Sequence, residues 1–196
     1  MNSKVMTLCS FMILSMLLSG CVYDRRNFVL EVCRDHPRQE VSKDVVLDVQ
    51  SFNVDTAFSN RSFVYRKNQS EYETDFYNQF LIRPEDMVTE KTRSWLSESG
   101  LFELVLEPGS YIDASHMLEG NIITLYGDFR DKSSPKATMK IRFILIKLSG
   151  KSVVFAKTYE TTSESNERTA KSLVAAFDNC LTNILSDLEA DLREHL

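Results

Sequence analysis

The position with the most distinctive chemistry in the sequence is Cys21, which directly follows an apolar run. Residues 5–18 carry no charge, Lys4 precedes them, and two small residues, the second of them Gly20, separate the run from the cysteine. A thiol in this place could be buried in a core, form half of a disulfide, or take up a lipid group. Each chemistry implies a different compartment.

The three-part layout before Cys21 is typical of a secretory signal, with a basic start, an apolar centre and a small-residue end. Its apolar centre is shorter than the roughly 20 residues that a transmembrane helix needs. A buried core helix is disfavoured, because no polar face appears between Phe11 and Leu18. Leu18-Ser19-Gly20-Cys21 also resembles the bacterial lipobox. The sequence therefore predicts a signal peptide over 1–20, cleavage between Gly20 and Cys21, and lipidation of Cys21 by acyl chains such as palmitate.

The residue after the lipobox cysteine indicates which membrane receives the protein. An aspartate there tends to retain lipoproteins in the inner membrane of Gram-negative envelopes, whereas this chain has Val22. We therefore expect attachment to the periplasmic face of the outer membrane rather than to the inner membrane. Several acyl chains on one cysteine hold a protein at a membrane stably.

Two other cysteines remain once Cys9 leaves with the signal peptide and Cys21 is acylated. In an oxidising periplasm Cys33 and Cys180 could form a disulfide worth about 2–4 kcal/mol. Two buried free thiols are the alternative, since sequence does not supply the Cα separation. No CxxC motif is present, which disfavours a redox enzyme.

Composition limits the remaining functions. The chain has 196 residues, of which 43% are hydrophobic and 26% charged, as expected of one globular domain. Its net charge is −5 with no block of Lys and Arg, so a nucleic-acid partner is not expected. The three histidines lack metal-ligand spacing, and no nucleophile, phosphate-binding or dinucleotide motif occurs. The sequence therefore predicts no metal, no cofactor and no enzymatic activity.

Hydrophobic periodicity predicts an α+β fold with a mostly antiparallel sheet and two helices packed on one face. A lipidated tether over 21–43, with a short strand near 28–32, is expected to precede one domain over 44–196. The expected strands are 44–52, a hairpin over 62–77, then 102–106, 117–129, 137–147 and 152–159. One helix is expected over 84–99, started by Pro84 and ended by Gly100. The second is expected to start near Asn166 and to run to the end of the chain.

The strand expected over 137–147 is apolar on both faces, with Ile144 and Ile146 opposing the alternate set that includes Ile141 and Phe143. This pattern fits a central strand covered on both sides, a strand at a subunit interface, or the wall of a lipid-binding cavity.

Aromatic residues concentrate around the expected hairpin. If they all pack in the core, the concentration reflects ordinary strand packing. The other interpretation is a contact surface, because large aromatic side chains are enriched at protein interfaces. The candidates for partner contact are Tyr65, Tyr72, Phe76, Tyr77 and Phe80.

Beyond these physical patterns, the stretch from 47 to 188 resembles the ABC-type transport auxiliary lipoproteins, the PqiC-like group. The matching positions are Tyr65-Arg66, Glu71-Tyr72, Phe76, Pro84, Gly100-Leu101-Phe102 and Leu118-Glu119-Gly120. One departure is Phe80, near which the family often has tryptophan.

That resemblance implies a non-enzymatic part of a system that moves lipid between the two membranes. The partners would be an MCE-domain protein with its permease and ATPase, phospholipid is a possible ligand, and some members of the group form homo-oligomeric rings. Two other functions stay open, a periplasmic lipid carrier and an activator of envelope assembly.

Overall fold

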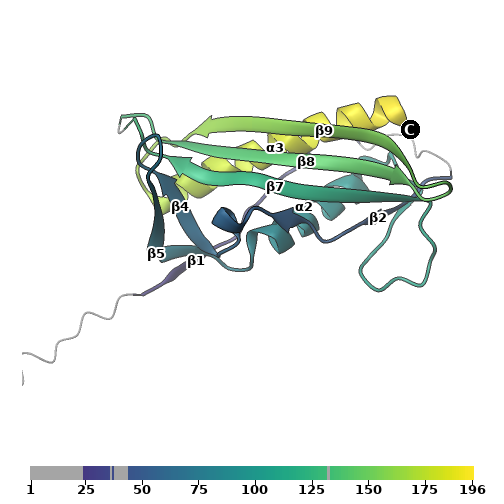
Figure 1. Cartoon of the computed structure of the whole chain (residues 1–196), viewed down its shortest axis with the longest axis horizontal. Helices are drawn as coiled ribbons and strands as arrows, with labels where there is room; N and C mark the ends of the chain where they lie inside the picture. Colours follow the sequence, from purple (N-terminus) through teal and green to yellow (C-terminus); the bar gives the residue numbers. More distant parts are fainter. Residues whose placement is uncertain (1–23, 36, 38–43, 132) are drawn as a thin grey trace, which may run out of the picture.

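The computed structural model describes residues 24–35, 37, 44–131 and 133–196 (Figure 1). Cys21, the signal peptide predicted over 1–20 and most of the second half of the expected tether lie outside the described residues. The elements are β1 (Arg26–Phe28), β2 (Val46–Val49), β3 (Asn53–Val54), the 3-10 turn η1 (Thr56–Phe58), β4 (Ser62–Arg66), β5 (Tyr72–Phe80), α2 (Pro84–Ser99), β6 (Leu104–Val105), β7 (His116–Asp128), β8 (Lys136–Lys147), β9 (Ser152–Glu164) and α3 (Ala170–His195).

The nine strands of the described chain form one mixed sheet built around β7. On one edge, β7 pairs with β8, and β8 with β9, in the predicted antiparallel meander. On its other edge β7 pairs in parallel with β2, β3 and β4 in turn. Three further strands extend this side: β5 lies antiparallel to β4 as the predicted hairpin, β1 lies parallel to β5, and β6 lies parallel to β2. The α+β prediction is confirmed, with parallel pairings that the sequence pattern did not indicate.

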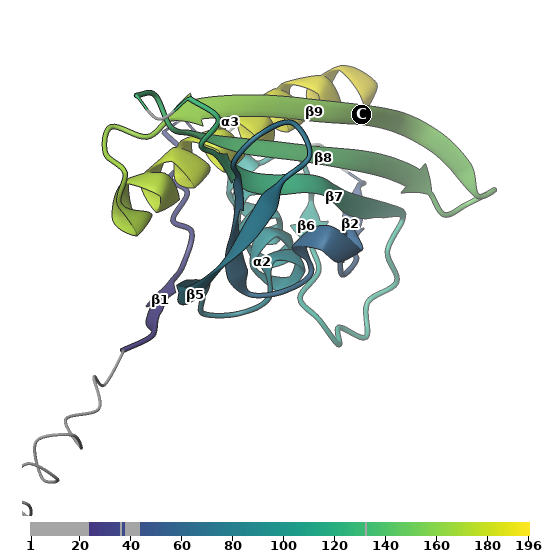
Figure 2. The same cartoon turned by 60° about the vertical axis from the view of Figure 1, so that its left-hand side comes forward.

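Both helices of the described chain lie on the same side of this sheet, as predicted (Figures 1 and 2). Helix α3 packs under β8 and β9, and α2 lies beside α3 under β2, β3 and β6. The face of β8 toward α3 is completely buried at Ala137, Met139, Ile141, Phe143 and Leu145. Helix packing therefore explains one apolar face of β8.

The other face of β8 stays more open. Ile144 and Ile146 are half-buried there, and they have neighbours on β7 and β9 of the same sheet. This face of β8 lies on the side of the sheet away from α3, so the strand is not enclosed between two layers of helices (Figure 2).

Helix α2 has the bounds that its end residues predict. Pro84 occupies its first turn, and Gly100 closes it with a φ of 75°, a left-handed conformation that favours glycine. The stripe predicted to face the core is buried as expected, at Met87, Val88, Thr92, Trp95 and Leu96.

The bounds of several other elements differ from the prediction. The short strand expected near 28–32 lies at Arg26–Phe28, and the hairpin expected over 62–77 continues to Phe80. Helix α3 begins at Ala170 rather than near Asn166, because Thr169 caps it by accepting the Ser172 N–H. Strand β9 continues to Glu164, since it stays paired with β8 as far as Lys136. The strand expected over 102–106 is reduced to Leu104–Val105.

Candidate functional site

The N-terminal segment of the described chain is bound to the domain along its length. Arg26 and Phe28 of β1 pair with Asn78 and Phe80 of β5. Leu30 is fully buried, and its N–H donates to the sulfur of Met87 at 3.3 Å. Within the segment expected to form a tether over 21–43 with a short strand, residues 26–34 therefore pack against the folded body.

Arg34 fixes the far end of this segment in a buried polar cluster. Its Nε and Nη2 donate to the two carboxylate oxygens of Glu189 at 2.8 and 2.7 Å. Trp95 Nε1 donates to the same carboxylate at 2.8 Å, so Glu189 joins the segment, α2 and α3. Burial alone would raise the pKa of Glu189, but the hydrogen bond and charge of Arg34 hold this pKa below its usual value.

A second bond between the segment and α3 comes from Glu31, whose N–H donates to Asp178 Oδ1 at 2.8 Å. Burial raises the pKa of Asp178 to about 6, and the Glu31 N–H only partly offsets this effect. The segment thus crosses β5, α2 and α3, and we call residues 26–34 the N-terminal clamp.

Of the five aromatic candidates, two are held inside the domain. Phe80 is 2% exposed and packs against Phe63 at a centroid distance of 4.6 Å, so its side chain belongs to the core and is not available to a partner. Tyr65 is half-buried, and its hydroxyl donates to Asp75 Oδ2 at 2.5 Å. Burial is the main cause that raises the pKa of Tyr65, and the hydrogen bond to Asp75 raises this pKa further.

The other three candidates reach the surface. Tyr72 is 46% exposed and lies edge-on to Tyr126. Phe76 and Tyr77 are 67% and 38% exposed, and the centroids of their rings lie 5.2 Å apart. Asp75 holds this stretch of β5 in an irregular turn, since its Oδ1 accepts the backbone N–H of both Tyr77 and Asn78.

Phe76 and Tyr77 lie beside the start of the described chain. The Arg25 guanidinium lies 4.9 Å from the centroid of the Phe76 ring. Val29 and Leu81 are also exposed, and the Leu81 N–H donates to the carbonyl of Phe28 in β1. We call Val29, Phe76, Tyr77 and Leu81 the aromatic end of the domain.

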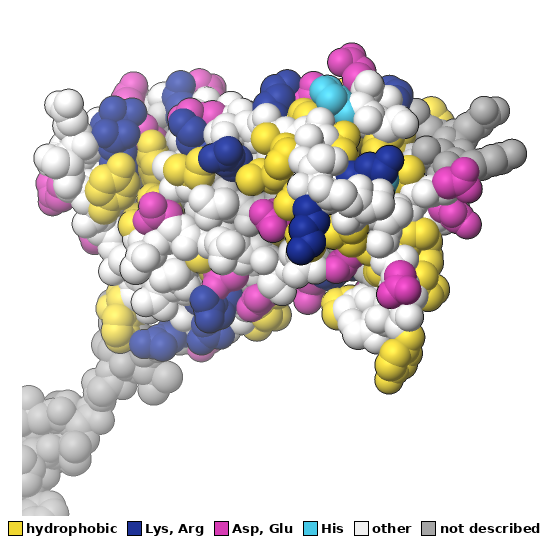
Figure 3. Space-filling view, turned by 45° about the vertical axis from the view of Figure 1, so that its right-hand side comes forward, with side chains coloured by type: hydrophobic (Ala, Val, Ile, Leu, Met, Phe, Trp, Pro, Cys, Tyr) yellow, Lys and Arg dark blue, Asp and Glu magenta, His cyan; other side chains and the backbone are white. Residues whose placement is uncertain are grey.

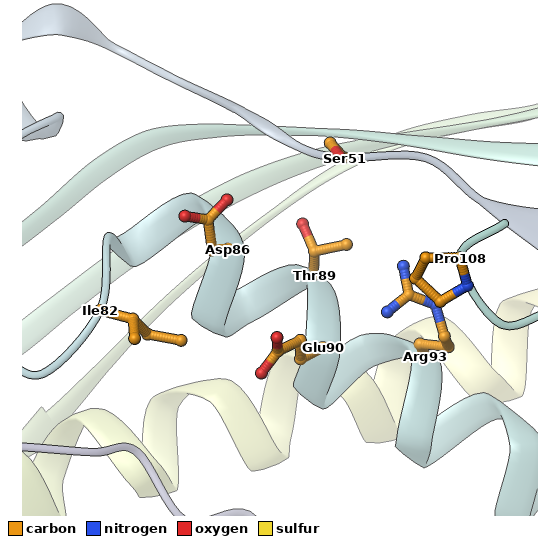
Figure 4. A pocket seen from close by; sticks show the side chains of 7 residues that line it. All are labelled: Ser51, Ile82, Asp86, Thr89, Glu90, Arg93 and Pro108. Atoms are coloured by element: carbon orange, nitrogen blue, oxygen red, sulfur yellow. The ribbon is translucent and has the colours of Figure 1, made fainter.

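A shallow pocket of about 280 Å³ opens on the surface of α2 (Figure 4). Its lining residues are Ser51, Ile82, Asp86, Thr89, Glu90, Arg93 and Pro108. Arg93 Nη2 donates to the carbonyl of Val49 at 3.1 Å, and Thr89 accepts the N–H of Phe52 at 3.0 Å. These two polar side chains therefore tie α2 to the β2–β3 segment.

A second pocket of about 400 Å³ lies at the start of α3. It is lined by Tyr65, Lys67, Asp75, Asn78, Phe129, Arg168, Thr169, Ala170 and Leu173. Lys67 and Arg168 both lie over the Phe129 ring, at 5.7 and 5.8 Å from its centroid. Among the described residues, no group of His, Cys, Asp and Glu is arranged to hold a metal ion.

The possible disulfide between Cys33 and Cys180 is not formed in the structure. Cys33 and Cys180 are both free, the first exposed and the second fully buried. Burial raises the pKa of the Cys180 thiol to about 12, which keeps it protonated. The alternative of two buried thiols is correct for Cys180 alone.

Sequence reasoning missed the Arg34–Glu189 cluster, although one signal was present. Glu189 follows Leu185 by four positions and precedes Leu192 by three, so it lies on the buried stripe of the last helix. A carboxylate on an apolar stripe requires a partner, because an unpaired buried charge is strongly unfavourable. The position of Arg34 in an apparent linker concealed that partner.

No family model and no curated protein sequence matches the chain. Solved structures do resemble it. Protein XCC0632 from Xanthomonas campestris, assigned to the family model DUF330, has a TM-score of 0.69 and 16% identity, over 84% of this chain and 92% of that one. An uncharacterized protein also gives 0.69, with 9% identity over 86% and 99%. The hypothetical protein CT253 from Chlamydia trachomatis gives 0.50, with 10% identity over 77% and 96%. At these identities the likeness shows a shared fold.

No helix of the described residues is long and apolar enough to span a membrane.

Proposed function

We propose that this protein is a lipid-anchored, non-enzymatic lipoprotein that docks an ABC/MCE-type lipid transport system at the periplasmic face of the outer membrane. The signal peptide would be cleaved after Gly20, and Cys21 would carry the lipid. The protein contributes binding and position, while a separate ATPase supplies the energy.

The N-terminal clamp is the observation that carries this proposal. Residues that follow an anchor usually form a loose tether, whereas here the chain pairs with β5 from Arg26 onward and then crosses α2 and α3. A body fastened so close to Cys21 keeps a fixed orientation toward the membrane. A docking component needs such an orientation, because its partner must find the same surface each time.

The resemblance to PqiC-like proteins supplies the partner. Several of its matching positions have clear structural roles here, such as Pro84 and Gly100 at the ends of α2. Gly120 is a third, since a Cβ there would lie 2.5 Å from the Phe52 ring. These residues support membership of the same fold, and the transport role comes from the family resemblance.

The anchor is tested with Cys21→Ala. The wild-type chain should fractionate with outer membranes after a salt wash, and mass spectrometry should find a diacylglyceryl thioether at its first residue. The variant should accumulate as precursor or soluble protein. A variant that still pellets with outer membranes contradicts the anchoring proposal.

The transport role is tested by affinity purification of the lipidated protein from membranes treated with a crosslinker. An MCE-domain protein should be recovered, and genes for an MCE protein, a permease and an ATPase should lie beside the gene for this chain. Recovery of a cell-wall synthase instead would favour the assembly activator. Native mass spectrometry of the Cys21→Ala protein distinguishes a ring component from a lipid carrier. A ring component should appear as a discrete oligomer, and a lipid carrier as a phospholipid adduct.

A further inference from the structure

We infer that the aromatic end of the domain lies against the lipid surface that holds the anchor, with Phe76 and Tyr77 in the interfacial region of the bilayer. This inference rests on the proposed lipidation of Cys21. It assigns these two aromatic side chains to lipid rather than to a protein partner.

The reach of the chain brings the aromatic end to the membrane. Cys21 precedes Arg26 by five residues, and a fully extended chain spans at most about 3.6 Å per residue, or roughly 18 Å in total. Arg26 is already paired with Asn78 in β5, two residues from Phe76. Because the chain is paired with β5 from Arg26 onward, a lipid on Cys21 holds Arg26 within about 18 Å of its own attachment point, and the aromatic end lies beside Arg26.

The chemistry of the aromatic end suits an interface between water and lipid. Phe76 is 67% exposed, Leu81 49%, Val29 39% and Tyr77 38%, so apolar surface is presented without a covering element. Amphipathic aromatic rings favour the headgroup level of bilayers. Exposed apolar patches of this kind mark interaction sites with proteins or membranes.

Basic side chains surround this apolar surface. Arg25, Arg26 and Arg61 are exposed, and the Arg61 Nη1 donates to the carbonyl of Leu81 within the aromatic end. Arginine binds phosphate groups through two donors at once. Figure 3 shows Lys and Arg atoms beside apolar ones at the lower left, near the beginning of the described chain. Local positive charge is notable in a protein with a net charge of −5, and it complements lipid phosphates.

The domain has a second exposed apolar site, in the segment between β6 and β7. Tyr111 and Ile112 are 104% and 54% exposed there. This segment projects at the end of the long axis opposite to β1 (Figure 1). The chain path therefore distinguishes the two sites, since only the aromatic end lies next to the predicted anchor.

The inference is tested by fluorescence quenching in vesicles. The lipidated chain is reconstituted into phosphatidylcholine vesicles with or without acyl chains brominated near the headgroup, because bromine quenches tryptophan only at close contact. Phe76→Trp places a reporter at the aromatic end, and Tyr111→Trp is the matched control at the opposite end. The native Trp95 is 3% exposed and serves as an internal reference in both variants. Leu81→Trp repeats the test at a second position of the aromatic end.

Vesicle flotation first checks the anchor, and a chain that does not float overturns both the proposed lipidation and this inference. For chains that float, the reporters at 76 and 81 should lose most of their added emission in brominated vesicles, while the reporter at 111 keeps its emission. If all three reporters lose the same fraction of their added emission in brominated vesicles, or if none of them loses any, the inference is overturned while the anchor stays in place.

Discussion

Arg34 and Glu189 are 155 positions apart in the sequence and form a two-point ion pair whose side chains are both 3% exposed. Arg34 belongs to the N-terminal clamp, and Glu189 lies near the end of α3. The pair therefore joins the N-terminal part of the described chain to its last helix, in addition to the β1–β5 pairing and the Glu31–Asp178 hydrogen bond.

We predict that Arg34→Met destabilises the domain by about 3–5 kcal/mol, because the buried Glu189 loses its two-point partner and keeps only the longer 3.5 Å pair with the more exposed Arg193. Urea denaturation followed by far-UV circular dichroism measures the change. The double variant with Glu189→Gln should recover much of the loss, since glutamine still accepts from Trp95 and carries no charge.

The matched control for this prediction is Lys140→Ala. Lys140 pairs with Glu160 at 2.7 Å, but both side chains are well exposed, at 34% and 55%. Exposed pairs of this kind contribute about 0–1 kcal/mol. An Arg34 variant as mild as the Lys140 variant would mean that the N-terminal clamp is not bound in solution.

Trp95 tests the packing of α2 against α3. The side chain is 3% exposed and donates to Glu189, so Trp95→Ala should cost about 3–5 kcal/mol, the usual loss for a large buried aromatic. Circular dichroism is again the appropriate readout, because the variant has no tryptophan. Ser94→Ala, one residue away and exposed, is expected to be nearly neutral. A Trp95 variant close to wild type would mean that the buried face of α2 is assigned incorrectly.

Elements whose signals are local could be predicted from the sequence. Pro84 and Gly100 fixed both ends of α2, and strict alternation found the three strands of the meander. The parallel pairings of β2, β3 and β4 with β7 could not be predicted, because they join distant segments without a local turn to set their register.

The aromatic candidates show how one irregularity in strand pairing changes which side chains of a strand are buried. Strict alternation would place Phe76 and Phe80 on the same face of β5. Between the pairs Ser62–Gln79 and Val64–Thr74, however, β5 advances by five positions while β4 advances by two. β5 therefore has an odd number of extra residues here, and an odd number moves the following side chains to the opposite face of the sheet. As a result Phe80 enters the core while Phe76 stays at the surface.

Asp178 gives the domain a pH dependence in the acidic range. Its pKa is about 6 in the folded state, above the ordinary value near 3.9, so the folded state binds the proton more tightly. The contribution of Asp178 to stability should therefore fall as pH rises from about 4 to 6, by about 1–2 kcal/mol after allowance for solvent screening.

Asp178→Asn should remove this contribution while keeping an acceptor for the Glu31 N–H. The variant and the wild type should have similar unfolding free energies near pH 4, and the variant should become the more stable of the two toward pH 7. Denaturation curves across this range measure the difference. A difference that does not change with pH would contradict the role given to Asp178.

The two described cysteines should differ in reactivity. Iodoacetamide should label Cys33 in the folded protein, because its side chain is exposed, and should label Cys180 only after unfolding. Peptide mapping by mass spectrometry gives both extents of labelling. Recovery of a linked Cys33–Cys180 peptide from a non-reduced digest of native protein would restore the disulfide that the structure lacks.

Gly120 has a steric reason to be glycine. It lies in β7 under the ring of Phe52, and a Cβ at position 120 would meet three ring atoms of Phe52 at 2.5–2.7 Å. Gly120→Ala should therefore destabilise the domain by about 1–3 kcal/mol, because the Phe52 ring is 4% exposed and packs edge-on against Phe143. Urea denaturation of the single variant measures this loss.

The partner variant separates steric crowding from a backbone effect of the glycine. Phe52→Leu creates space above position 120 and is itself destabilising, since it removes part of a buried ring. In the double variant Gly120→Ala with Phe52→Leu, the alanine fills some of that space, so the two costs should sum to more than the loss measured for the double variant. Strictly additive losses would show that Phe52 and Gly120 do not contact each other in solution.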